Sequence, residues 1–185
     1  MMRKKVISAT VALLATVASF AHAEEDARLI KARALADQLP PKLGAVLKAE
    51  IAKSGPEGAI SVCRDEAPKI AKELSKESGT RIRRVSLQQR SCKAKPDKWE
   101  KAVLEEFDRR AAAGEPLTTL EKGEQVGSKY RYMKALPVQD RCLNCHGSLE
   151  TMKPAVKAAL EQHYPKDKAT GYREGQIRGA ISVRL

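Results

Sequence analysis

Two cysteines and a histidine stand together late in the chain, in the segment Cys142-Leu143-Asn144-Cys145-His146. Within one helical turn, positions i, i+3 and i+4 share a face, so two thiols and an imidazole can reach one flat group. This spacing is typical of covalent haem attachment, in which the thiols bind one edge of the porphyrin. Cys142 and Cys145 are therefore predicted to hold one haem c, and His146 is predicted to be the proximal ligand of its iron.

Other chemistry for the same motif fits the surrounding sequence less well. A thioredoxin-like redox pair requires a strand before it and a helix after it, whereas this motif follows Leu136-Pro137-Val138 and precedes Gly147 in a segment typical of a loop. A zinc site needs further Cys or His residues at ligand spacing, and none is near. A disulfide within the motif would close a small strained ring. Haem attachment remains the favoured interpretation.

The first 23 residues have the layout of a secretory signal peptide. Three basic residues precede an apolar stretch over residues 6–20, and Ala21-His22-Ala23 matches a small-x-small cleavage pattern. The stretch is too short for a comfortable membrane span, although an uncleaved anchor is the alternative. We therefore expect residues 1–23 to be removed, no stable membrane span, and a periplasmic location. Export agrees with the motif, because c-type haem is attached outside the bacterial cytoplasm.

The length of the chain limits the number of domains, and its charge limits the kinds of partner. The 185 residues are enough for one ordinary domain, so residues 24–185 are predicted to form a single haem domain. Aromatic residues make up only 4%, and a haem would add flat apolar area to such a core. Removal of residues 1–23 lowers the formal net charge from +12 to +9, because Arg3, Lys4 and Lys5 leave and no acidic residue does. This charge suits a redox partner protein with an acidic surface, or an anionic membrane surface. No zinc-finger or RNP motif indicates a nucleic-acid partner, and the oligomeric state stays open.

Apolar periodicity and turn residues predict helices followed by strands. The last nine residues, Ile177 to Leu185, alternate strictly between apolar and polar or small side chains, which is typical of a strand. Helices are predicted over residues 25–38, 42–53, 69–76, 97–113 and 154–164, with a further helical turn near residues 58–63. Strands are predicted over residues 80–88 and around residues 130–132. This order indicates an α+β fold.

The sequence resembles the stand-alone c-type haem domains of PAS-like fold, which also occur as sensor modules of histidine kinases. The resemblance is carried by the following segments: Gly58-Ala59-Ile60-Ser61-Val62-Cys63, Ala67-Pro68, Arg84-Val85-Ser86, Pro96-Asp97-Lys98-Trp99-Glu100, Cys142 to Gly147, Tyr164 to Tyr172, and Arg178 to Val183. The resemblance implies a PAS-like antiparallel sheet flanked by helices, with N-terminal helices and one haem in its pocket. In this family a cysteine can take the sixth iron position, and the matching residue is Cys63.

The residues alone leave several distal iron ligands open. Cys63, Cys92, His163, Met133 and Met152 are candidates, as is an open or water-bound position. A thiolate would favour ferric iron and a low potential. The alternative role for Cys63 is a disulfide with Cys92, which an oxidising compartment permits. His163 otherwise has the position of an ordinary residue at the end of a helix.

Some neighbouring residues have simpler interpretations. Trp99 has helical spacing with the following apolar residues and is predicted to belong to the core. The arginines over residues 81–84 are typical of a solvated strand face, although one of them could pair with a haem propionate. Tyr172, Arg173 and Arg178 are further candidates for that role.

Three functions are compatible with these features. The favoured one is an exported monohaem cytochrome acting in periplasmic one-electron transfer, with no enzymatic activity. The alternative is a haem-based redox or gas sensor, which would act through a separate partner protein because the chain has no transmitter segment. A haem enzyme such as a peroxidase would need acid–base groups beside an open iron position, and His163 is the one histidine available there.

Covalent attachment can be tested with the double substitution Cys142→Ala and Cys145→Ala. Without both thiols no thioether bond can form, so we expect a protein without covalently bound haem. The measurement is haem staining after denaturing electrophoresis. A stained band at the mass of the variant would refute the attachment.

Overall fold

The structure, a computed structural model, describes residues 27–185, so the predicted signal peptide over residues 1–23 lies outside the described residues. A helical stretch over residues 27–36 begins the described part. The further elements are α2 (Leu39–Ser61), the π-turn η1 (Val62–Glu66), α3 (Ala67–Ser78), β1 (Arg81–Val85), η2 (Cys92–Ala94), α4 (Lys98–Ala112), η3 (Leu117–Thr119), β2 (Glu121–Val126), β3 (Lys129–Pro137), η4 (Asp140–Cys142), α5 (Leu143–His146), α6 (Pro154–His163) and β4 (Ile177–Arg184). No helix of residues 27–185 is long and apolar enough to cross a membrane.

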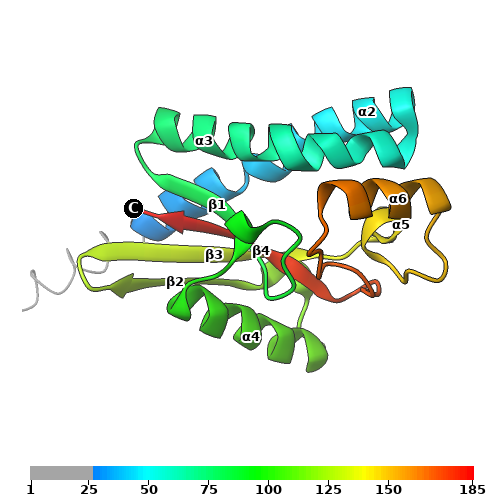
Figure 1. Ribbon diagram of the computed structural model, residues 1–185. Coiled ribbons are helices and arrows are strands. Elements are labelled where there is room, and N and C mark those ends of the chain that lie inside the picture. Colours follow the sequence, from blue (N-terminus) through cyan, green and yellow to red (C-terminus); the bar gives the residue numbers. More distant parts are fainter. Residues whose placement is uncertain (1–26) are drawn as a thin grey trace, which may run out of the picture.

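The four described strands form one antiparallel sheet in the order β1-β4-β3-β2. Figure 1 shows α2 and α3 crossing one face of this sheet and α4 covering the other. The short helices α5 and α6 lie at the end of the sheet that is remote from the C-terminus (Figure 1). The last strand of the chain, β4, occupies an inner position, so its alternating apolar residues can pack on both faces.

Each face of the sheet carries its own apolar core. On the α2–α3 face, the buried residues are Ala32, Ala36, Leu39, Leu74, Ile82, Tyr130, Tyr132, Ile181 and Val183. On the α4 face, they are Val85, Val103, Leu104, Phe107, Leu120, Met133, Ala135, Ile177 and Ala180. Trp99 packs against this second core, its ring under the guanidinium of Arg131 at 4.3 Å. The predicted core role of Trp99 is therefore confirmed.

The α+β fold predicted from the sequence is confirmed, with an antiparallel sheet flanked by helices. The helix predicted from residue 42 begins earlier, at Leu39, because prolines are tolerated in the first helical turn, where the N–H groups have no helical partner. The predicted turn at residues 55–58 is only a kink in α2, where Gly55 adopts a φ of 73°. Strand β2 was not predicted.

Gly179 is required where β4 passes the end of β1. A Cβ atom placed on Gly179 would lie 2.3 Å from the carbonyl oxygen of Val85, which is backbone and cannot move aside alone. The close approach also lets Ser86, directly after β1, donate from its hydroxyl to the carbonyl oxygen of Arg178 at 2.8 Å. This junction lies beside the cavity described below.

Gly179→Ala is expected to lower the free energy of unfolding by about 1–3 kcal/mol, because the added methyl group overpacks the β1–β4 junction. The matched control is Gly44→Ala in α2, where a Cβ would meet no atom within 4 Å. That control is expected to raise stability by roughly 0.5–1 kcal/mol, since alanine favours the helix. Urea unfolding measures both, and equal effects would contradict the role of Gly179.

Candidate functional site

The Cys142–His146 motif forms a single tight turn. η4 ends at Cys142 and α5 follows at once, so the motif is helical, as its spacing predicted, within an otherwise irregular connection. The N–H of Gly147 donates to the carbonyl oxygen of Leu143 at 2.9 Å and closes the turn. Cys142 and Cys145 are free, half-buried thiols. Burial raises the pKa of Cys145.

The imidazole of His146 is held in one tautomer. Its Nδ1 lies 2.7 Å from the carbonyl oxygen of Ala169, and because a carbonyl oxygen can only accept, Nδ1 carries the hydrogen. The lone pair is therefore on Nε2, the nitrogen that remains for a metal. Burial first, and then the positive charge of Arg178, lower the pKa of His146 well below its usual value, so the ring is neutral.

A buried ion pair ties the motif to the loop that carries Ala169. Arg90 donates from Nε to Asp167 at 2.9 Å, and both side chains are about nine-tenths buried. The same guanidinium also donates to the carbonyl oxygens of Cys145 and Ala169. The N–H of Ala169 in turn donates to Asp167 at 2.8 Å. These contacts fix the position of the carbonyl group that orients His146.

Cys63 and His146 line the same cavity. The cavity has a volume of about 110 Å³ and is lined by Cys63, Arg84, Val85, Ser86, Arg90, Ser91, Ala94, Leu136, His146, Tyr164, Arg178 and Gly179. Cys63 comes from the π-turn η1 and His146 from α5, so two elements far apart in the sequence contribute one candidate iron ligand each. Single-turn π segments occur frequently at functional sites.

The cavity wall is rich in positive charge. Arg178 is mostly buried and donates to Ser86 Oγ at 2.7 Å and to the carbonyl oxygen of Gln88 at 3.1 Å. Burial, and then the neighbouring Arg90 and Arg84, lower the pKa of Arg178. Within residues 27–185, neither Arg84 nor Arg178 forms an ion pair with a carboxylate. The wall can therefore accommodate an anionic group.

These residues fit a haem. Two thiols and a neutral imidazole lie on one turn, and the unpaired arginines suit the two propionate carboxylates. The volume of 110 Å³ is smaller than the roughly 300 Å³ at which typical ligand pockets begin. Arg178 occupies part of the space, with its Nε 3.2 Å from Nδ1 and 3.5 Å from Nε2 of His146. Binding therefore requires this side chain to move away from the imidazole.

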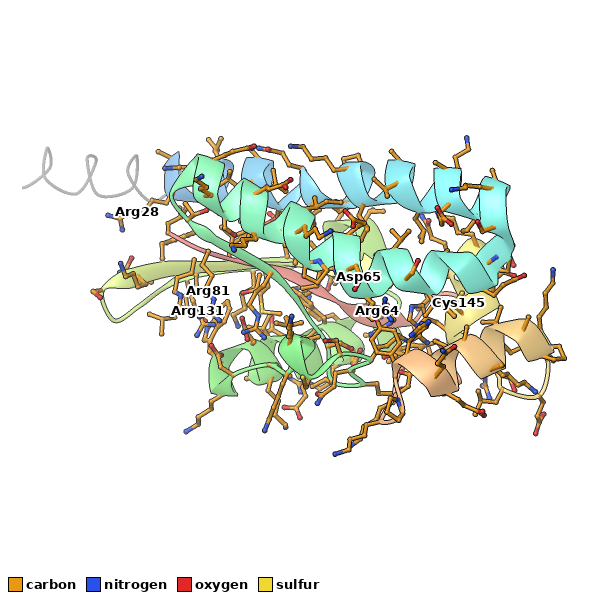
Figure 2. The ribbon with its side chains drawn as sticks, turned by 45° about the horizontal axis from the view of Figure 1, so that its top comes forward. Arg28, Arg64, Asp65, Arg81, Arg131 and Cys145 are labelled. Carbon is orange, nitrogen blue, oxygen red and sulfur yellow. The ribbon has the colours of Figure 1, made fainter. Side chains whose placement is uncertain are left out.

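The structure separates the other candidate ligands from the cavity. His163 ends α6, and its Nδ1 lies 2.6 Å from Nη1 of Arg64, as expected for an ordinary helix-end residue. Met133 is fully buried in the core against α4, whereas Met152 packs with Ile60 near Cys145. Figure 2 shows Arg64 and Cys145 at one end of the molecule, far from Arg81 and Arg131.

Cys92 lies on η2 as an exposed free thiol, and Cys63 is also free, so the structure contains no disulfide between them. The sequence did not predict the roles of Arg90 and Asp167, because the two residues are 77 positions apart and local spacing cannot pair them. Arg84 and Arg178, by contrast, were among the arginines considered as propionate partners, and both line the cavity.

Comparisons with known proteins identify a matching family and a similar haem protein. The sequence model of the Tll0287-like family matches residues 5–185. Among solved structures, the crystal structure of the cyanobacterial haem protein Tll0287 is similar, with a TM-score of 0.63 and 27% sequence identity. The similarity covers 88% of this chain and 94% of that chain. No curated protein matches.

Asp167→Asn is expected to lower the free energy of unfolding by about 3 kcal/mol or more, because the buried guanidinium of Arg90 loses its counter-charge. The control is Glu105→Gln, which breaks the exposed pair of Glu105 with Lys101 on α4. It should cost less than about 1 kcal/mol. Both values come from urea unfolding, and a loss no larger in Asp167→Asn than in the control would show that the buried pair is unimportant.

Proposed function

The chain belongs to the Tll0287-like family, and from this premise we propose that it is an exported monohaem c-type cytochrome acting in periplasmic one-electron transfer. The similarity to a haem protein supports a haem cofactor and fits a non-enzymatic role. In this proposal Cys142 and Cys145 form the thioether bonds, His146 is the proximal ligand and Cys63 is the distal ligand.

The observation that carries the proposal is that Cys63 and His146 line one cavity from two separate elements. Two protein ligands would fill both axial positions of an iron and leave none open. Electron transfer requires no open position, whereas a peroxidase or a gas-binding site does. His163 does not line this cavity and lies beside Arg64, which favours electron transfer over a peroxidase with a distal histidine.

The surrounding residues suit this role. Bound haem supplies a one-electron Fe(III)/Fe(II) couple, whose potential depends on axial ligands, hydrogen bonds and burial. The hydrogen bond from His146 Nδ1 to Ala169 orients the imidazole and strengthens Nε2 as a donor. A thiolate at Cys63 would stabilise the ferric state, and Arg84 and Arg178 would compensate the propionate charges.

The N-terminal sequence supports a periplasmic location, and the net charge supports an acidic partner. The N-terminal pattern over residues 1–23 supports secretion to the periplasm. Without Arg3, Lys4 and Lys5 of the predicted signal peptide, the formal net charge is 12 − 3 = +9. This charge supports docking to an acidic redox partner, because complementary charge speeds encounter and suppresses wrong partners.

A redox or gas sensor acting through a separate partner protein is the second candidate. The position of Cys63 on η1 favours it, because this π-turn joins α2 to α3 and lies between two regular helices. A shift of the turn would withdraw the thiol from the cavity and open one axial position. The resemblance to PAS-like sensor modules points in the same direction.

Optical spectra distinguish the two candidates. For an electron carrier with Cys63 as ligand, we expect the ferrous wild-type spectrum to stay unchanged under CO, because both axial positions are filled. Cys63→Ser should shift the ferric Soret band, raise the reduction potential and admit CO. The matched control Cys92→Ser alters an exposed cysteine outside the cavity and should behave as the wild type does.

Ready binding of CO by the wild type would contradict the carrier and favour the sensor. Equal effects of Cys63→Ser and Cys92→Ser would instead exclude a specific ligand role for Cys63. Ferric electron paramagnetic resonance of the same three proteins identifies the axial ligand directly.

A further inference from the structure

A second and larger cavity lies on the α4 face of the sheet. Its volume is about 520 Å³, and its walls come from α4, the segment after β1 and the segment that leads into β4. Cavities of roughly 300–1,000 Å³ are the usual size for small-molecule sites. Neither Cys63 nor His146 lines it, so it is distinct from the candidate haem site.

The inner part of this cavity is apolar. Leu104 and Ile177 are buried side chains of the α4-side core, and the partly buried Leu87 packs beside them. The ring of Tyr172, which is also buried, forms another part of the wall. An apolar body of a few carbon atoms up to one ring would lose its contact with water here, which favours binding.

One acidic side chain stands at the rim without a counter-charge. Asp108 projects from α4 and lines the cavity, and within residues 27–185 it forms neither an ion pair nor a hydrogen bond. The neighbouring acid Glu105 is paired with Lys101. Partial burial and the charge of Glu105 raise the pKa of Asp108. Asp108 is exposed and lines the cavity, so a positive group bound there can reach its carboxylate and pair with it.

The cavity adjoins the candidate haem site, because Tyr172 lines the cavity and also contacts His146. Tyr172 meets His146 edge-on, with 6.3 Å between ring centroids, and the guanidinium of Arg178 lies 5.4 Å from the Tyr172 ring centroid. Gly179 lines both cavities. The two sites are therefore neighbours but have separate ligand groups.

We propose that this α4-side cavity binds a small organic cation with an apolar body, whose charge pairs with Asp108 while its body lies against Leu87, Leu104 and Ile177. The proposal goes beyond electron transfer, because it assigns the protein a ligand that does not contact the iron.

The test uses calorimetric titration of the haem-loaded protein with benzyltrimethylammonium. Its quaternary nitrogen has no lone pair, so it cannot bind the iron and can bind only through charge and apolar contact. We expect measurable binding to the wild type, about tenfold weaker binding to Asp108→Asn, and unchanged binding to Glu77→Gln. The Glu77 variant removes an exposed carboxylate from α3, on the opposite face of the sheet from the cavity.

Two further measurements address the apolar wall and the charge preference. Ala111→Leu on α4, which fills part of the cavity, should abolish binding whatever the charge of the probe. Benzyl alcohol and benzenesulfonate, as neutral and anionic probes, should bind more weakly than the cation. Absence of cation binding to the wild type, equal binding by Asp108→Asn, or equal binding of the sulfonate would each overturn the proposal. The Soret band gives the haem content of every sample. A variant that loses cation binding but keeps its haem has lost only the α4-side cavity, whereas loss of haem would indicate failure of the haem site.

Discussion

The buried guanidinium of Arg90 holds together the parts from which the candidate haem site is built. It pairs with Asp167, donates to the carbonyl oxygen of Cys145 and donates to that of Ala169. Ala169 in turn accepts the Nδ1 hydrogen of His146. An α5 turn of four residues is too short to be stable alone, so its geometry depends on these long-range contacts. The position of the metal-binding nitrogen is thus set by residues outside the haem motif.

Two chemically different cavities adjoin at Gly179 in β4. The cavity with Cys63 and His146 carries excess positive charge from arginines, whereas the α4-side cavity has an apolar wall and the unpaired Asp108 at its rim. Gly179 is the wall that the two share, and the backbone there approaches Val85 too closely for any side chain. A side chain at position 179 would therefore disturb both the pairing of β1 with β4 and the boundary between the two cavities.

Sequence patterns predicted the elements whose signals are local. The alternation in β4 and the helix predicted from residue 97 are visible along the chain, and β4 and α4 confirm them. Strand β2 was missed because Glu121–Val126 is a polar edge strand with no apolar alternation, and charged residues are common on edges that must not pair further. The shared cavity of Cys63 and His146 could not be derived from spacing, because tertiary packing alone brings them together. The resemblance to a known family supplied that expectation.

The π-turn at Val62–Glu66 sets the rotation of α2 about its axis relative to α3. A π segment accommodates one more residue than an α-helix of the same rise, and each residue rotates an α-helix by about 100°. Loss of one residue from this turn would restore regular hydrogen bonding locally. It would also rotate α2 against α3 by about that angle and carry Cys63 away from its cavity. An in-frame deletion that improves the helix would therefore damage the site more than most substitutions.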